Sequence, residues 1–314
     1  MFTIKLTDIT KQDRCFAGGK GAFLGEMVRN GIPVPPGFVI LADAFEEFFE
    51  RSGLRHRFDL ALQNAAGLDI DGIDAVAQNL QELMISAEIP APLAEEIELQ
   101  FKELDAAFVA VRSSATAEDA ASNAWAGQLE TYLNTDKSIL LENVKRCWAS
   151  LYSPRAICYR IDSKQIGEKI SVAVVVQKMV ASAVSGVAFS VHPVTEDHNN
   201  IVIEAAIGLG EAVVSGAITP DNYVVEKDPL KIVEKGISKQ DKAIYRLSTG
   251  ETGWQAVTKH QRNQQKITDS QIMELSRLVI KIEKQFGFPC DIEWALFNNA
   301  FFILQCRPIT TLSG

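Results

Sequence analysis

The segment DIEWALFNNAFFILQCRP (291–308) has the pattern of two β-strands joined by a tight connection. Side chains alternate between the two faces of a strand, so Asp291 and Glu293 share one face while the apolar residues that alternate with them take the other. Gln305 and Arg307 are likewise two residues apart in the second strand. The pattern predicts polar groups on one face of an otherwise apolar hairpin.

The register of this hairpin decides which polar side chains meet. If residues 298–300 form a three-residue loop, Glu293 lies opposite Gln305, and Asp291 lies opposite Arg307. A two-residue loop would put these partners on opposite faces. The three-residue loop therefore predicts one patch that holds two carboxylates, an amide and a guanidinium.

Two interpretations of this patch remain open from the hairpin alone. Buried polar groups need partners or a ligand. Carboxylate and amide oxygens suit a hard cation such as Mg²⁺, and an arginine suits a phosphate. The alternative is an Asp–Arg ion pair on a solvated face of a sheet.

The composition narrows the class of protein. The chain has 314 residues, a net charge of -9 and 47% hydrophobic residues, which indicates a globular protein of one large bilobal domain or two small domains. The negative charge argues against binding to nucleic acid or to an anionic membrane. No signal peptide and no apolar stretch of about 18 residues is evident, so a cytoplasmic protein is expected. The five cysteines are scattered, which suggests neither a disulfide framework nor a zinc site.

A glycine-rich turn lies near the N-terminus in AGGKGAFLGEM (17–27). Its apolar residues make one face of a short helix that stops at Gly31, so Lys20 lies at the start of that helix. A phosphate is favoured there by the lysine and by the backbone N–H groups of the first turn. The alternative is a solvent-exposed lysine in a flexible turn, since the spacing is not that of a Walker loop.

A buried strand at 108–112 ends in Arg112, at the kind of strand end where open α/β sheets hold ligands. The small and hydroxyl residues of 113–127 suit a mobile loop that covers phosphates, or they form an ordinary alanine-rich loop or a frayed helix start. Residues 128–134 are expected to form a strand that carries Thr131.

The apolar run 171–180 is typical of a strand covered on both faces, and it is interrupted by Gln177 and Lys178. Helices expected at 42–52, 73–86 and 91–105 are interpreted as scaffold, without assigned chemistry. Another helix is expected to start from an Asp136 cap, and exposed antiparallel strands are expected within 221–260. A further helix is expected to run from a capping box at Thr268–Gln271 to Gly287.

Eight segments in this order resemble one family. They are GGKGAFLGEM (18–27), GIPVPPGF (31–38), VRSSATAED (111–119), AGQLETYLN (126–134), VAVVVQKMV (172–180), GLGEAVVSGAITPD (208–221), DIEWAL (291–296) and LQCRP (304–308). Together they are similar to the nucleotide-binding N-terminal domain of phosphoenolpyruvate synthase (pyruvate, water dikinase), pyruvate phosphate dikinase and rifampin phosphotransferase.

The resemblance implies an α+β fold of ATP-grasp type, with lobes at 1–180 and 181–314 that close on ATP. It implies a phosphotransferase with paired acceptors that passes phosphate from ATP to a histidine on a separate domain. Lys20 and Arg112 would hold phosphates as catalytic residues, under the loop 113–127.

The resemblance also assigns the remaining ligands. Thr131 would bind near the phosphates, and Gln177 with the backbone around Met179 would contact adenine. Glu293 and Gln305 would hold Mg²⁺, and Arg307 would be a third catalytic residue on phosphate. Asp291 would be an additional metal ligand or a group that positions the ligands.

One departure from the family pattern concerns the acceptor. The family's histidine domain, with its Thr-Gly-Gly…Ser-His signature, is absent, and so is any pyruvate or antibiotic site. His192 lies where the family has no phosphorylated histidine, so it is interpreted as structural or surface. The chain is therefore expected to act with a partner in trans or as part of a longer enzyme. The alternatives are the ATP-binding part of an antibiotic phosphotransferase and a nucleotide sensor without turnover.

Overall fold

The computed structural model describes residues 1–116, 130–310 and 312. The chain divides into two compact units. Unit 1 comprises Met1–Glu26 and Pro36–Met179, and unit 2 comprises Met27–Pro35 and Val180–Gly314. The division expected from the sequence assigned all of 1–180 to the first lobe, whereas the segment Met27–Pro35 packs within unit 2, where Ile303 N–H donates to the Pro33 carbonyl at 2.7 Å.

Unit 1 contains a five-stranded sheet of order β1-β2-β5-β3-β4, in which all neighbours are antiparallel. Its strands are β1 (Thr3–Lys5), β2 (Gly37–Ile40), β3 (Val109–Ala115), β4 (Thr131–Thr135) and β5 (Val172–Lys178). Its helices are α1 (Arg14–Arg29, of which residues 27–29 belong to unit 2), α2 (Ala42–Ser52), α3 (Arg55–Ala65), α4 (Ile70–Ser86), α5 (Ala91–Leu104), α6 (Leu140–Ala149) and α7 (Pro154–Asp162), with short 3₁₀ turns at Leu6–Asp8, Lys11–Asp13 and Ser150–Tyr152.

Alternation along the strands decides which face of this sheet is core. Val109 and Val111 of β3 and Val172, Val174 and Val176 of β5 are fully buried in one apolar cluster with side chains from α2 to α7. α1 lies against the other face. The residues of β3 and β5 between these valines therefore point away from the main core.

Two helix starts differ from the sequence-based expectation. α4 begins about one turn before residue 73, because Asp69 caps it by accepting from Gly72 N–H at 2.9 Å. The expectation that Asp136 caps the next helix was wrong. Its carboxylate accepts from Ser138 N–H at 2.8 Å in a local turn, and α6 begins only at Leu140.

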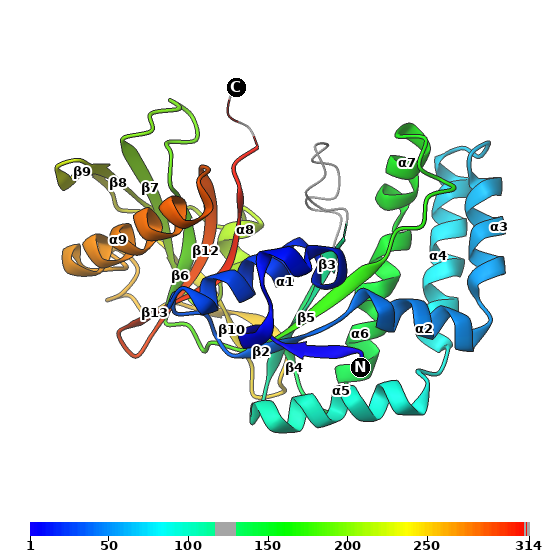
Figure 1. Ribbon diagram of the computed structural model, residues 1–314. Helices are drawn as coiled ribbons and strands as arrows, with labels where there is room; N and C mark the ends of the chain where they lie inside the picture. The colour runs from blue at the N-terminus through cyan, green and yellow to red at the C-terminus, as the bar shows by residue number, and fades with distance from the viewer. Residues whose placement is uncertain (117–129, 311, 313–314) are drawn as a thin grey trace. The chain divides into compact units, whose positions relative to one another are not determined.

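Unit 2 contains a six-stranded antiparallel sheet of order β13-β12-β6-β7-β8-β9 and a separate β10-β11 pair. Its elements are β6 (Val184–Phe189), β7 (Asn200–Ile207), α8 (Glu211–Val214), β8 (Asp221–Lys227), β9 (Leu230–Gly236), β10 (Lys242–Arg246), β11 (Thr252–Ala256), α9 (Asp269–Phe286), β12 (Cys290–Phe297) and β13 (Ala300–Pro308). α9 lies along one face of this sheet (Figure 1). Its capping box at Thr268–Gln271 and its end at Gly287 are confirmed.

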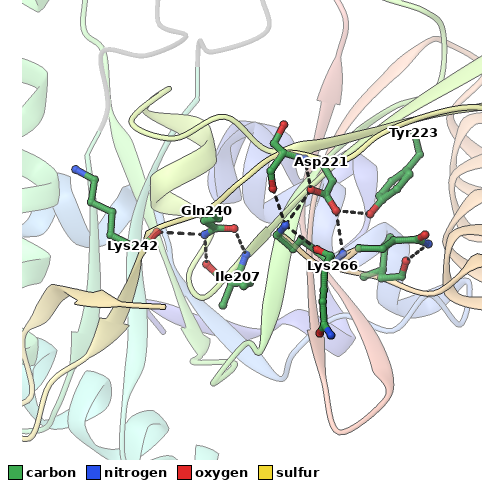
Figure 2. Close-up of polar contacts among 10 residues, drawn as sticks. Ile207, Asp221, Tyr223, Gln240, Lys242 and Lys266 are labelled. Atoms are coloured by element: carbon green, nitrogen blue, oxygen red, sulfur yellow. Dashed lines mark hydrogen bonds and ion pairs between the residues drawn. The ribbon is translucent and has the colours of Figure 1, made fainter. Parts of the chain in front are cut away.

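A buried polar network anchors the chain around β10 and β11. Asp221 is completely buried and accepts from Tyr223 Oη at 2.7 Å, from Ser238 N–H and Lys266 N–H at 2.9 Å, and from Lys266 Nζ at 3.1 Å (Figure 2). Burial, followed by the Asp221 carboxylate, raises the pKa of Tyr223. This network joins the start of β8 to the segment that leads into α9.

The β12–β13 hairpin has the expected pairs but not the expected loop. Its loop is the two residues Asn298 and Asn299, both with positive φ (49° and 60°), as a tight hairpin turn requires. The three-residue loop was therefore wrong. A β-bulge between Glu293 and Trp294 makes Leu304 an extra residue of β13, so Glu293 still faces Gln305, and the pair Asp291 and Arg307 is also confirmed.

Candidate functional site

The Lys20 turn is a break in α1. Gly18 has φ 68° and ψ 173°, which no α-helix accommodates, so Lys20 lies in the first turn of a new helical segment, as expected. A Cβ atom on Gly18 would lie 2.2 Å from the carbonyl oxygen of Ser114. Only glycine therefore permits both this backbone conformation and this close approach of α1 to β3.

The unit 1 sheet has one face on the main core, and its other face carries three of the residues expected to bind the nucleotide. Arg112 of β3 pairs directly with Thr131 of β4, and Ala110 pairs with Gln177 of β5. Residues two apart share a face, so Arg112, Thr131 and Gln177 lie on one side of the sheet. Arg112 is 7% exposed, and Thr131 is exposed to solvent. The structure thus gathers a guanidinium, a hydroxyl and an amide away from the main core.

Gln177 has an unusual hydrogen-bonding state. It is 2% exposed, and its Nε2 atom has no hydrogen-bond partner among the described residues. A buried amide donor without an acceptor is unfavourable and calls for an explanation. An acceptor on a bound ligand would satisfy this group.

Met179 and the expected phosphate loop complete the unit 1 set. Met179 N–H donates to the Phe108 carbonyl at 3.0 Å, so this N–H is already used in the protein. Most of the loop 113–127, including Trp125, lies outside the described residues, and residues 113–115 belong to β3.

Two charged groups, Glu130 and Lys20, act on the pKa of the buried Cys147 thiol. Burial, followed by the Glu130 carboxylate, raises the pKa of Cys147, while Ser113 and the Lys20 ammonium oppose that rise. A thiol with a raised pKa is a poor nucleophile, so Cys147 is part of the core rather than of the chemistry.

In unit 2 the candidate side chains form a cross-strand row. Glu293 of β12 faces Gln305 of β13 on one side and Val187 of β6 on the other, and Val187 faces Glu204 of β7. Glu204 was not singled out from the sequence, because only the pairing of three strands places it in this row. Its local signal is a carboxylate that follows the apolar run IVI in β7.

The Asp–Arg ion pair considered from the sequence is present. Arg307 Nε donates to Asp291 Oδ2 at 2.9 Å, with side chains 47% and 12% exposed, respectively. Burial nevertheless raises the pKa of Asp291, because the Arg307 charge only partly offsets it and Glu293 adds to it. Burial, followed by the Asp291 charge, also raises the pKa of Glu204. A cation at this face would offset the unfavourable burial of the Asp291 and Glu204 charges.

The donor set fits Mg²⁺ better than a metal held by protein alone. Among the described residues, no three His, Cys, Asp or Glu side chains are grouped so that they could hold a metal ion. Mg²⁺ commonly takes one or two carboxylates and completes its shell with water and substrate phosphates. The carboxylates of Asp291 and Glu293, on the same face of the hairpin as the Gln305 amide, match that pattern.

His192 has a structural role in a turn. Its Nδ1 accepts from Val194 N–H at 3.3 Å and from Thr195 N–H at 3.2 Å. This agrees with its interpretation as a structural residue. None of the described helices is long and apolar enough to cross a membrane.

The folds of the two units and these side chains are those of an α+β protein with candidate phosphate and cation ligands. Residues 15–314 match the family model described as pyruvate phosphate dikinase, AMP/ATP-binding domain. The chain therefore belongs to the family of these nucleotide-binding domains.

Curated relatives cover nearly the whole chain. It is 41% identical to a probable phosphoenolpyruvate synthase of Methanocaldococcus jannaschii over 99% of its residues, and 40% identical to a phosphoenolpyruvate synthase of Pyrococcus furiosus over 97%. It is 38% identical to a rifampicin phosphotransferase of Bacillus cereus over 99%. The chain spans 27%, 43% and 36% of the lengths of these three proteins, respectively, so each contains further domains.

Proposed function

We propose that this chain is the ATP-binding, phosphoryl-transferring domain of a phosphoenolpyruvate synthase-like enzyme, with an ATP-grasp type of fold. The observation that carries the proposal is the common face of Arg112, Thr131 and Gln177 in unit 1. Membership of an AMP/ATP-binding family supports ATP as the ligand. Because ATP is consumed, we expect the enzyme to work in the cytoplasm.

In unit 1, the proposed roles follow from charge and burial. Lys20 and Arg112 attract the phosphates, and the N–H groups of the helix start beside Lys20 favour the same charge. The Thr131 hydroxyl donates to a phosphate oxygen. The Gln177 amide donates to a nitrogen of the adenine ring, which satisfies its buried Nε2, and Met179 contributes its backbone next to it.

In unit 2, Glu293 and Gln305 are the proposed Mg²⁺ ligands, and Asp291 orients Arg307 or adds a ligand. Arg307 is exposed enough to bind a phosphate while it keeps its bond to Asp291. Mg²⁺ neutralises phosphate charge that develops during transfer. Cations placed around the phosphates supply most of the catalysis in such reactions, and little covalent chemistry is required of the protein.

The acceptor is proposed to be a histidine on another domain or in a partner chain. The longer relatives support this, since they contain chain beyond the matched domain. Rifampicin phosphotransferase activity is the second candidate, because that relative is nearly as similar as the synthases. In the isolated domain, labelled ATP should be turned over slowly, and no stable phosphohistidine should form on His192 or His198.

Titration calorimetry with ATP and Mg²⁺ tests the proposal. Arg112→Met keeps an apolar stem of similar length and removes the charge, so affinity should fall by about ten- to a hundredfold, the usual value of hydrogen bonds to a charged group. Arg155→Met, at an exposed position of α7, is the matched control and should bind like the wild type. Absence of binding by the wild type, or equal binding by both variants, would overturn the proposal.

A further inference from the structure

Ser114 contacts both sides of the break in α1. It lies on β3, is completely buried, and shares the sheet face of Arg112, two residues away. Its Oγ accepts from Gly21 N–H at 3.2 Å and donates to the Ala17 carbonyl at 2.9 Å. One hydroxyl thus bonds to the helical segment before Gly18 and to the segment after it.

These two backbone groups are natural partners of each other. In an uninterrupted α-helix, the N–H of Gly21 would donate to the carbonyl four residues earlier, which is that of Ala17. A side chain inserted into this ladder is a recognised cause of a sharp kink. The Ser114 hydroxyl stands between the two groups and satisfies both, so the break has no unpaired buried polar atom at this point.

The glycine at the break completes the arrangement. A Cβ atom on Gly18 would meet the Ser114 carbonyl oxygen at 2.2 Å and its Oγ at 2.3 Å, so this backbone lies directly on Ser114. Lys20 lies in the chain between Gly18 and Gly21, and both glycines contact Ser114. The position of Lys20 relative to β3, and hence to Arg112, depends on these contacts.

We propose that Ser114 is a positioning residue that holds the α1 break open and so directs Lys20 toward the phosphates of ATP. This inference rests on the proposed function, because it needs ATP to be the ligand. Ser114 itself does not touch the nucleotide. Its effect is confined to the phosphate end of the ligand, since it acts through Lys20.

The test compares two ligands in titration calorimetry: ATP, which has the phosphates, and adenosine, which lacks them. Ser114→Ala lets Gly21 N–H bond directly to the Ala17 carbonyl, so the variant should remain folded with a straighter helix. ATP affinity should fall by about three- to tenfold, as expected for a misplaced hydrogen-bonding group, while adenosine affinity stays unchanged. Ser114→Cys keeps the side-chain volume but has a weaker hydrogen-bond donor, so its ATP affinity should lie between those of the wild type and Ser114→Ala.

A matched control is Ser150→Ala. Ser150 is also buried, at 1% exposure, and its Oγ donates to the Cys147 carbonyl at 2.7 Å. Its loss removes a comparable hydrogen bond and should leave the ratio of ATP affinity to adenosine affinity unchanged. A purely structural role of Ser114 would give the same result for both serines.

A double-mutant cycle with Lys20→Ala shows whether Ser114 acts through the lysine. Ser114→Ala should cause no further loss of ATP affinity once Lys20 is removed. An unchanged affinity ratio in Ser114→Ala and Ser114→Cys, or an equal loss in the Lys20→Ala background, would overturn the inference while leaving the proposed function intact. A wild type that binds no ATP would overturn both.

Discussion

Glu293 faces Gln305 across β12 and β13 because Leu304 is an extra residue in β13. With the two-residue turn at Asn298–Asn299 and no bulge, an acidic residue at 293 would instead face Leu304. The bulge therefore sets the pairing on which the candidate cation site depends.

Deleting Leu304 should remove the bulge and leave the pairing of Glu293 with Gln305 intact, because Trp294 already pairs with Ile303. We expect a folded variant with a modest loss of melting temperature. Deleting Cys306 is the control, since it would move Arg307 opposite the buried Ile292 and bring a charge into the core. Thermal unfolding of both variants decides, and equal losses would contradict this account of the register.

Gln177→Leu should stabilise the ligand-free protein while weakening ATP binding. The substitution removes a buried Nε2 that has no partner in the described chain, a gain of about 1 kcal/mol in unfolding free energy. Gln240→Leu is the control at equal burial, 2% in each case. Its amide bonds to both backbone groups of Ile207 at 2.9 and 3.0 Å, so its loss should destabilise by about 1–3 kcal/mol. Chemical denaturation gives both values, and a destabilised Gln177→Leu would contradict the prediction.

Glu204→Gln should change how stability depends on pH. Burial and then Asp291 raise the pKa of Glu204 above the ordinary 4.5. The protonated form of Glu204 contributes to the unfolding free energy. This contribution is fully present below the ordinary pKa of 4.5 and is lost as the pH rises through the raised pKa of the folded protein. The variant should therefore match the wild type near about pH 4 and melt higher than the wild type near about pH 8. Melting curves across this range check the sign, and a variant less stable at the higher pH would contradict it.

Lys266→Met should be strongly destabilising. Lys266 and Asp221 are 2% and 0% exposed, and the substitution leaves the buried carboxylate without its counter-ion, at a cost of about 3–5 kcal/mol. Lys239→Met breaks the 2.8 Å pair with Asp241, whose side chains are 59% and 53% exposed, and should cost no more than about 1 kcal/mol. Denaturant midpoints of the two variants measure the difference. Similar values would mean that the buried network (Figure 2) is not an anchor.

Sequence periodicity predicted the face of a strand on which side chains lie better than it predicted where helices and strands begin and end. Alternation in β12 placed Asp291 and Glu293 on one face correctly, because a one-residue error would expose a core face. The expectation that the strand at 108–112 ends in Arg112 was wrong, since β3 continues to Ala115 and Arg112 lies within it. The start of α6 was missed because Asp136 bonds locally instead of capping the helix.

Other features depend on contacts that no local pattern encodes. α3 was not predicted, since only Phe58, Leu62 and Ala65 of its residues are buried, too few for a clear helical stripe. Glu204 and Ser114 acquire their places from strands and helices far away in the sequence. Three-dimensional pairing was therefore needed to identify them.

The most direct test of the central claim is whether Glu293 holds Mg²⁺ with ATP. Glu293→Gln keeps the shape and removes the charge, so melting without nucleotide should barely change, and the Mg²⁺-dependent stabilisation by ATP should shrink. Glu234→Gln, on exposed β9, is the control and should keep the full response. Melting temperatures are compared with and without ATP, in Mg²⁺ or EDTA. An undiminished Mg²⁺-dependent shift in Glu293→Gln, with about 1–3 kcal/mol lost without ligand, would show that Glu293 is structural and contradict the account.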